Sequence, residues 1–554
     1  MPFELVLNIK KMKTYKILLL ILAVTSLAAC TKLNTTLHDS LVPATGGNLD
    51  PQTLVNNAYN DLGALLTNQD QLFSLEETTS DEELVPTRGG DWDDNGVWRV
   101  LHAHTWDVTH TQSQTVFVNL GKLESDATTT LAFNPSPDIA AQAVFLRSLA
   151  QFYFLDLYGQ VPYRTVPNYN TINAPPVLTP AAAIDTLVQN LTAIIPALSA
   201  GNSPYKASPD AARFLLMKVL LNKQSFLNKE TPAPADAADM AQVISLGQAI
   251  MGGSYSLTPH YFDNFSPNNG GFSPGYGWGQ STEMVFAYPQ KPGAATTSGI
   301  NSAGTDARWM MTLHYNSYGH KGDGVYGNAG WNGFSTVADF YNAFDATDTM
   351  RKGNVPYPGV TNVSGLRVGL LQGQQYDEKG AIRLDRNSNP LIFNTTVNLI
   401  EPDRNTLEGN GVRIIKYPPD YGAYNSGHQG NQLVIFRYAD VMLMVAEAHL
   451  RSDDAGGTGA SLTLVNNLRQ ARKASTLGTL SLVNTANLYD ANTLLAERQK
   501  EMYWESWRRQ DLIRFGVFLQ PWALKTKDDP KYLLFPIPST QLIANPNLKQ
   551  NPGY

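Results

Sequence analysis

Cysteine is almost absent from this chain, because Cys30 is the only one among 554 residues. A disulfide within one molecule is therefore excluded. Cys30 also lies close to the N-terminus, directly after Leu27, Ala28 and Ala29. A role in processing of the chain explains a lone cysteine at this position better than a place in the core does.

Clusters of positive charge are also missing. The chain has 41 Lys and Arg residues against 48 Asp and Glu residues, which gives a formal net charge of -7, and the basic residues form no block. Proteins that bind nucleic acids need a basic patch to neutralise the phosphate backbone. We therefore do not expect a nucleic acid partner.

A run of apolar residues long enough to cross a membrane is lacking as well. The apolar run 17–24 is too short to be a comfortable span. It follows Lys13 and Lys16 and precedes small residues, which is the order of a secretory signal. Because the residues before Cys30 resemble a bacterial lipobox, we predict a lipoprotein signal peptide at 1–29, lipidation of Cys30 and a tether at 30–47. Such an anchor holds a protein on a membrane without spanning it.

Helical periodicity is found at both ends of the mature chain and is lacking in the middle. The spacing of apolar residues predicts helices at 51–66, 139–157, 179–198, 208–227, 235–251, 434–450 and 461–474. Helices that follow one another in pairs favour a mainly α fold, a tetratricopeptide-like superhelix. We expect a single domain at 48–554, with a helical scaffold formed by 48–254 and 432–554. The segment 255–431 is rich in Gly, Asn and Tyr and is expected to be an irregular, loop-rich layer on that scaffold.

Acidic residues recur in the C-terminal part without requiring a catalytic role. Glu497, Glu501 and Glu505 are spaced by four residues and are expected on one helix face. Arginines and lysines surround them in the sequence, so ion pairs between residues three or four positions apart explain the pattern without chemistry. The charged residues of the very apolar stretch 436–450 are predicted to be buried and to need partners.

The stretch GGDWDDNGVW, residues 89–98, raises the possibility of a calcium loop. Asp91, Asp93, Asn95 and Gly96 have the spacing of oxygen ligands followed by a turn glycine. An EF-hand loop that starts at Asp91 should end in a glutamate, and position 102 is a histidine. An EF-hand is therefore not expected, and a looser structural calcium site between Asp91 and Asp94 stays open. No other metal or cofactor is expected.

The two tryptophans of the same stretch favour a different use. Sugar rings stack on flat aromatic rings, and their hydroxyl groups bind to polar side chains such as Asp93, Asn95 and Arg99. Trp92 and Trp98 are therefore candidates for a ligand platform. The alternative is that one or both tryptophans fill the core below the loop.

Several separated stretches together resemble the SusD/RagB family of glycan-binding outer-membrane lipoproteins. They are the lipobox, SDEELVPTRGGDWDDNGVWRVLHAHTWD from Ser80, AVFLRSLAQFYFLDLYGQVPY from Ala143, WNGFSTVADFYNAFDATDTMRKG from Trp331, FRYADVMLMVAEAHL from Phe436, RQKEMYWESWRRQDLIRFG from Arg498, and LLFPIPSTQLIANPNLKQNPGY from Leu533.

The resemblance implies a lid on a SusC-like TonB-dependent outer-membrane transporter. The protein would be anchored in the outer membrane by its lipid, face the cell exterior, capture oligosaccharide and pass it to the transporter, without catalysis. In the family the glycan site uses an N-terminal loop, which here contains Trp92, Asn95 and Trp98. It also uses the irregular layer, where we choose candidates for their loop context, namely Tyr276, Trp278, Trp309 and Tyr315.

Three other functions remain open on the sequence alone. A secreted glycoside hydrolase would need two carboxylates at a defined separation, drawn from Asp81, Glu82, Asp91 and Asp93. A transporter lid could instead carry peptides. An adhesin or structural surface protein would bind neither glycan nor transporter.

Overall fold

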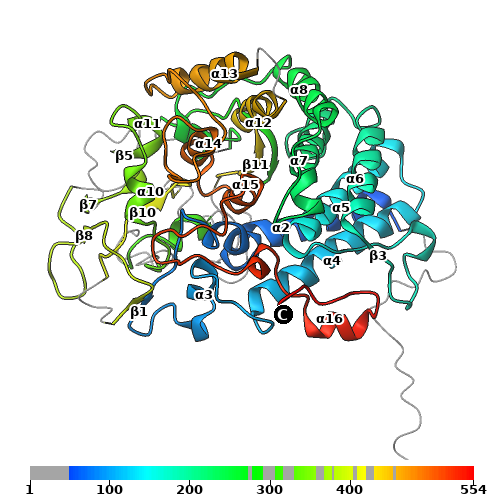
Figure 1. Cartoon of the computed structure of the whole chain (residues 1–554), viewed down its shortest axis with the longest axis horizontal. Helices are drawn as coiled ribbons and strands as arrows, with labels where there is room; N and C mark the ends of the chain where they lie inside the picture. Colours follow the sequence, from blue (N-terminus) through cyan, green and yellow to red (C-terminus); the bar gives the residue numbers. More distant parts are fainter. Residues whose placement is uncertain are drawn as a thin grey trace, which may run out of the picture. The chain divides into compact units, whose positions relative to one another are not determined.

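Eight helices from the two ends of the chain pack one against the next in a computed structural model of the protein (Figure 1). The structure describes residues 49–272, 277–290, 306–315, 330–356, 367–376, 380–402, 408–419, 430–452 and 457–554. In spatial order these helices are α2 (Pro51–Thr67), α4 (Thr111–Ala132), α5 (Pro137–Tyr158), α6 (Pro180–Ile194), α7 (Pro209–Leu227), α8 (Ala237–Met251), α12 (Tyr438–Arg451) and α13 (Gly457–Ala471). The middle of the sequence is thus inserted between α8 and α12. The packing of each helix against the next confirms the predicted mainly α superhelix of helix pairs.

Side-chain caps fix where several of these helices begin. Asp50 accepts hydrogen bonds from the backbone of Gln52 and Thr53, and Ser208 accepts one from the backbone of Ala211. Both helices then start with proline. Proline has no backbone N–H, and this costs nothing at the first helical position, because the N–H groups of the first turn have no partner within the helix. The helices predicted at 51–66 and 208–227 are confirmed for this reason, and those at 139–157, 179–198, 235–251 and 461–474 are confirmed with small shifts of their ends.

The structure corrects one predicted helix and contains one long helix that was not predicted. Residues 434–437 belong to strand β11 (Leu433–Arg437), and helix α12 begins only at Tyr438. A short buried strand and a buried helical turn have the same apolar pattern, so periodicity does not separate them. The long helix α4 was not predicted at all, because its sequence is rich in Thr and contains Gly121, both of which lower helix propensity.

The middle segment forms small sheets and short helices rather than loops alone. Strand β4 (Met284–Tyr288) pairs with β11, and β6 (Arg367–Leu371) lies between β5 (Gly353–Pro356) and β10 (Arg413–Ile415). The other strand pairs, some of which include strands outside the middle segment, are β1 (Thr87–Arg88) with β9 (Ile400–Glu401), β2 (Val161–Pro162) with β3 (Val177–Leu178), and β7 (Gly373–Gln374) with β8 (Ile392–Phe393). The remaining short helices are α3 (Arg99–His102), α9 (Asp306–Met310), α10 (Ala338–Asn342), α11 (Thr349–Lys352) and α16 (Ser539–Ala544).

Helices α14 (Leu494–Met502) and α15 (Arg508–Arg514) join the two parts. In Figure 1 they lie between the helices α7 and α12 and the strands of the middle segment. Helix α14 packs against α12 and α11, and α15 packs against α7 and against the π-helical segment η1 (Gln69–Thr78). The superhelix and the irregular layer therefore meet at these two helices.

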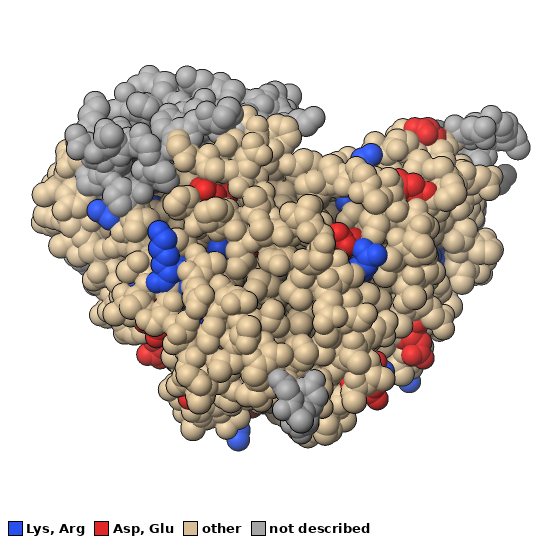
Figure 2. All heavy atoms as spheres, turned by 90° about the horizontal axis from the view of Figure 1, so that it is seen from above, with Lys and Arg blue, Asp and Glu red and all other residues tan. Residues whose placement is uncertain are grey.

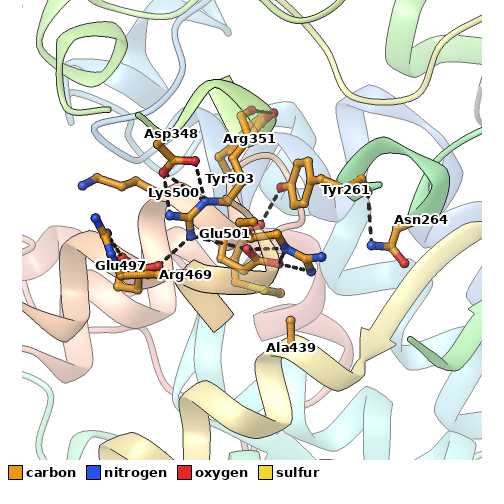
Figure 3. Close-up of polar contacts among 12 residues, drawn as sticks. Tyr261, Asn264, Asp348, Arg351, Ala439, Arg469, Glu497, Lys500, Glu501 and Tyr503 are labelled. Atoms are coloured by element: carbon orange, nitrogen blue, oxygen red, sulfur yellow. Dashed lines mark hydrogen bonds and ion pairs between the residues drawn. The ribbon is translucent and has the colours of Figure 1, made fainter. Parts of the chain in front are cut away.

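A buried network of ion pairs fills this junction. Glu497 binds Arg351 and Arg469, each at 2.6 Å (Figure 3). Glu501 binds Arg437 at 2.7 Å and Arg472 at 2.8 Å. The side chains of all these residues are at most 1% exposed. The partners come from distant elements, so the prediction of pairs three or four residues apart is wrong for these two glutamates.

Two further features concern the surface and the ends of the chain. On the face shown in Figure 2, charged side chains are few and scattered. None of the helices in the described ranges combines the length and the hydrophobicity of a membrane span. The predicted signal peptide, Cys30 and the tether lie outside the described residues and stay predictions.

Candidate ligand-binding site

The loop that carries Trp92 and Trp98 has an unusual backbone. Trp92, Asp94 and Asn95 have φ angles of 59°, 38° and 55°, and Gly96 follows with 84°. A left-handed conformation is unfavourable for a bulky residue such as tryptophan, and it persists only where the surrounding structure holds it. Asp91 and Arg88 exchange backbone hydrogen bonds, and the guanidinium of Arg99 binds Asp93 at 2.6 Å. The loop is thus a fixed turn, and not a free tip.

Three tryptophans from two distant stretches meet at this turn. The ring of Trp92 lies 5.4 Å from Trp98 and 6.3 Å from Trp331, and its edge packs on Phe334. The Trp92 indole donates a hydrogen bond to the carbonyl of Trp331, and the Trp98 indole donates to Asp94 at 2.7 Å. Trp92 and Trp331 are partly exposed, whereas Trp98 is buried with 4% exposure. Trp92 and Trp331 therefore offer ring surface to a ligand, and Trp98 supports them from below.

Gly333 makes room for the Trp92 ring. A Cβ atom at this position would lie 2.4 Å from the indole, closer than van der Waals contact allows. The ring is rigid, and its indole nitrogen is bound to the Trp331 carbonyl, so it has little freedom to move aside. The glycine thus lets the two stretches approach closely enough to place Trp92 beside Trp331.

An open hollow of about 560 Å³ lies beside these tryptophans. The residues that line it, which we call the tryptophan hollow, are Gln69, Asp70, Trp92, Asp94, Val97, Trp98, Thr111, Gln112 and Trp331. Gln112 is 7% exposed, and the side-chain oxygens of Gln69 and Gln112 are buried without a hydrogen-bond partner among the described residues. Both side chains line the hollow, and an amide group both donates and accepts hydrogen bonds, as the hydroxyl groups of a ligand do.

A second hollow of about 350 Å³ lies on the other side of the turn. It is lined by Asp94, Asn95, Gly96, Val97, Val100, Thr105, Trp106, Asp107, Thr109, His110 and Thr111. It shares Asp94, Val97 and Thr111 with the tryptophan hollow. Asn95 therefore lies on this second side, so the structure brings Trp92 and Trp98 together but turns Asn95 away from them.

Of the four candidate residues in the middle segment, two are buried and one lies outside the described residues. Trp278 is 6% exposed and Trp309 is fully buried, so both belong to the hydrophobic core. The expectation that they lie on a ligand surface is corrected, because a ring without exposed surface cannot stack on a sugar. Their loop context was misleading, since large aromatic residues in loops often anchor those loops to the core. Tyr276 lies outside the described residues.

Tyr315 supports the turn instead of lining either hollow. Its hydroxyl donates a hydrogen bond to Asp91, and the guanidinium of Arg386 lies 3.8 Å above its ring. Burial and the neighbouring Asp91 raise the pKa of Tyr315 to about 12. Through these contacts, Tyr315 connects the middle segment to the base of the turn.

The carboxylates proposed for calcium each face a different partner. Asp91 binds Tyr315 and Arg386, Asp93 binds Arg99, and Asp94 binds the Trp98 indole. Within the described ranges, no group of three acidic, histidine or cysteine side chains is arranged to hold a metal ion. The calcium site stays a prediction without support from this geometry.

Two of the four carboxylates proposed for a hydrolase are buried. Asp81 is fully buried and forms a bidentate pair with Arg508, at 2.7 and 2.8 Å, and Glu82 is 1% exposed. Two groups that cannot reach a polysaccharide cannot act as acid and base on its glycosidic bond. They are part of the core that joins η1 to α15.

Comparisons with known proteins agree with this fold. A sequence model of the SusD family matches residues 248–528, over half of the chain. The starch-binding protein SusD of Bacteroides thetaiotaomicron is 23% identical, over 92% of this chain and 94% of that protein. The SusD-like protein P2 of Formosa agariphila is 24% identical, over 98% of this chain and 100% of that protein. A solved structure of a laminarin-binding SusD-like protein superposes with a TM-score of 0.64 at 18% identity, covering 91% and 99% of the two chains.

The fold is thus that of a helical scaffold protein with an irregular layer inserted between its helices. The chain belongs to the SusD family. Members of this family bind glycans without catalysis, so the chain is not an enzyme and the hydrolase alternative is wrong.

Several residues of the tryptophan hollow, among them three polar side chains and one tryptophan, were missed in the sequence. Gln69, Asp70 and Gln112 stand in ordinary polar stretches, where no spacing or motif distinguishes them. Trp331 lies in a stretch that carried the family resemblance, but it is 239 positions from Trp92. Only the fold shows that these residues meet.

Proposed function

We propose that the protein is a lipid-anchored glycan-binding protein of the outer membrane. It captures oligosaccharide outside the cell and delivers it to a SusC-like TonB-dependent transporter. The observation that carries this proposal is the tryptophan hollow, where two partly exposed indole rings lie beside amide and carboxylate oxygens. Ring surface together with hydrogen-bond acceptors matches the two faces of a sugar, its C–H surface and its hydroxyl groups.

The family relationship supports the other parts of the proposal. A relative over nearly the whole chain is named a starch-binding protein, and a structural neighbour is described as binding laminarin. The predicted signal peptide and the predicted lipidation of Cys30 are consistent with a protein anchored by its lipid to the outer membrane. A transporter lid that binds peptides remains the second candidate function. It has the same lipid anchor, location and transporter partner, and differs only in the ligand.

The proposal is tested by electrophoresis of the mature protein, without residues 1–30, in native gels that contain polysaccharides of plant, microbial and host origin. We expect retardation by at least one polysaccharide and no shortened products after long incubation. Retardation by peptides alone would favour the second candidate. Release of oligosaccharides would contradict a binding protein.

A further inference from the structure

The two hollows share one electrostatic property, which is the lack of any positive charge. Their titratable lining residues are Asp70, Asp94, Asp107 and His110, and within the described part of the chain neither hollow is lined by lysine or arginine. Burial lowers the pKa of His110, so its ring is neutral at neutral pH. The lining therefore carries only negative charge.

The nearest arginines of the turn are already neutralised. Arg99 binds Asp93 at 2.6 Å and Thr87 at 2.6 Å, which directs its guanidinium toward the base of the turn. Arg386 lies over Tyr315 and pairs with Asp91 and Glu408. Neither guanidinium lines a hollow, so neither is placed to bind a ligand carboxylate there.

The hydrogen-bonding groups of the tryptophan hollow also favour an uncharged ligand. Asp70 lines the hollow with a carboxylate, which accepts hydrogen bonds but never donates them, and Gln69 and Gln112 line it with amides, which both accept and donate. Such a lining is complementary to hydroxyl groups, which also donate and accept hydrogen bonds. Among the described residues, it offers no cationic side chain to pair with a carboxylate or sulfate.

From this lining we infer that the ligand is an uncharged glycan, and that glycans with carboxylate or sulfate groups are rejected. This inference rests on the proposed function and adds the substrate class to it. The rejection has two parts, repulsion by Asp70 and Asp94 and the lack, among the described lining residues, of a lysine or arginine to pair with an acidic group. Specificity of this kind is built from what the site disfavours as much as from what it binds.

The test compares one glycan with its own acidic derivative. The uncharged polysaccharide that retards the protein most is oxidised at its primary hydroxyl groups to carboxylates, and the binding of both forms is measured by titration calorimetry. We expect the oxidised form to bind roughly tenfold more weakly or worse. Added salt should narrow this gap, because screening weakens the repulsion.

Exchange of Asp70 tests the origin of the rejection. Asp70→Lys should improve binding of the oxidised form several-fold relative to the wild type, and Asp70→Asn, which keeps the shape of the side chain, should improve it less. Asp185→Lys makes the same charge change at an exposed position of α6, and it should leave the ratio between the two forms unchanged.

The outcomes separate this inference from the proposed function. Equal or tighter binding of the oxidised form by the wild type would overturn the inference and leave glycan binding intact. An equal effect of Asp70→Lys and Asp185→Lys would also overturn it, because the rejection would then come from overall charge. Binding of no glycan in either form would overturn both the inference and the proposed function.

Discussion

At the scale of single residues, burial decides which side chains of the polar surface can act on a ligand. Trp92 and Trp98 look equivalent in the sequence, yet one ring is partly exposed and the other is 4% exposed. Gln112 looks unimportant in the sequence, yet its side chain lines the tryptophan hollow. Spacing along the chain carries no information on either difference.

Glu124 in α4 gives a residue-scale prediction for pH. Burial raises the pKa of its carboxyl from 4.5 to about 7, although Arg147 and Arg164 oppose the shift. The folded state thus binds the proton more tightly than the unfolded state. Its contribution to stability is fully present below pH 4.5 and is lost as the pH rises to about 7.

Glu124→Gln removes this charge and should stabilise the protein at pH 8 but not at pH 4.5. We expect a gain on the order of 3 kcal/mol at most, because one pKa unit corresponds to about 1.4 kcal/mol. Thermal unfolding at the two pH values measures the difference. Glu230→Gln, at an exposed position, controls for the loss of one negative charge. The same change in melting temperature at both pH values would contradict the prediction.

At the scale of elements, helix positions were predictable and their charged partners were not. The caps at Asp50 and Ser208 and the prolines after them mark helix starts in the sequence itself. The nearest partners of Glu501 are Arg437 and Arg472, which come from the end of β11 and from just after α13. Such pairs depend on tertiary packing, so a rule for neighbours on one helix could not find them.

The tryptophan hollow was predictable to the same limited degree. The aromatic turn at 89–98 stands out in the sequence, but its second half, Trp331 and Gly333, is brought to it only by the fold. Trp278 and Trp309 show the opposite error, because an aromatic residue in an irregular segment is as readily an anchor in the core as a surface for a ligand.

The buried ion network gives a prediction for the junction between superhelix and irregular layer. The guanidinium of Arg437 binds Glu283 at 3.1 Å and Glu501 and Glu505 at 2.7 Å each, with 1% exposure. Burial raises the pKa of Glu501, but Arg472 and Arg437 lower it by more, so it stays ionised. Removal of Arg437 would leave these carboxylates buried with too little positive charge.

Arg437→Met should therefore lower the free energy of unfolding by about 3 to 5 kcal/mol. Urea unfolding followed by circular dichroism measures this loss. Arg213→Met is the matched control, because Arg213 pairs with Asp210 while 28% exposed and should contribute less than about 1 kcal/mol. A loss as small as that of the control would show that the network does not hold the junction together.

At the scale of the whole molecule, the helical scaffold fixes the place where two distant stretches meet. Residues 89–98 lie between η1 and α4, and residues 330–334 belong to the segment inserted between α8 and α12. The same scaffold occurs in SusD-family proteins that are less than 25% identical to this chain. The scaffold is therefore compatible with many different loop sequences, and we expect the ligand to be determined by residues such as Trp92, Trp331 and Asp70.

The measurement that tests the central claim most directly is titration calorimetry of the mature protein with the glycan that retards it. Trp331→Ala should weaken binding by on the order of 1 kcal/mol or more without lowering the melting temperature markedly, because the ring is partly exposed. Phe272→Ala, an aromatic residue with 42% exposure that lines neither hollow, should bind as the wild type does. Unchanged affinity of the Trp331 variant would contradict the tryptophan hollow as the glycan site.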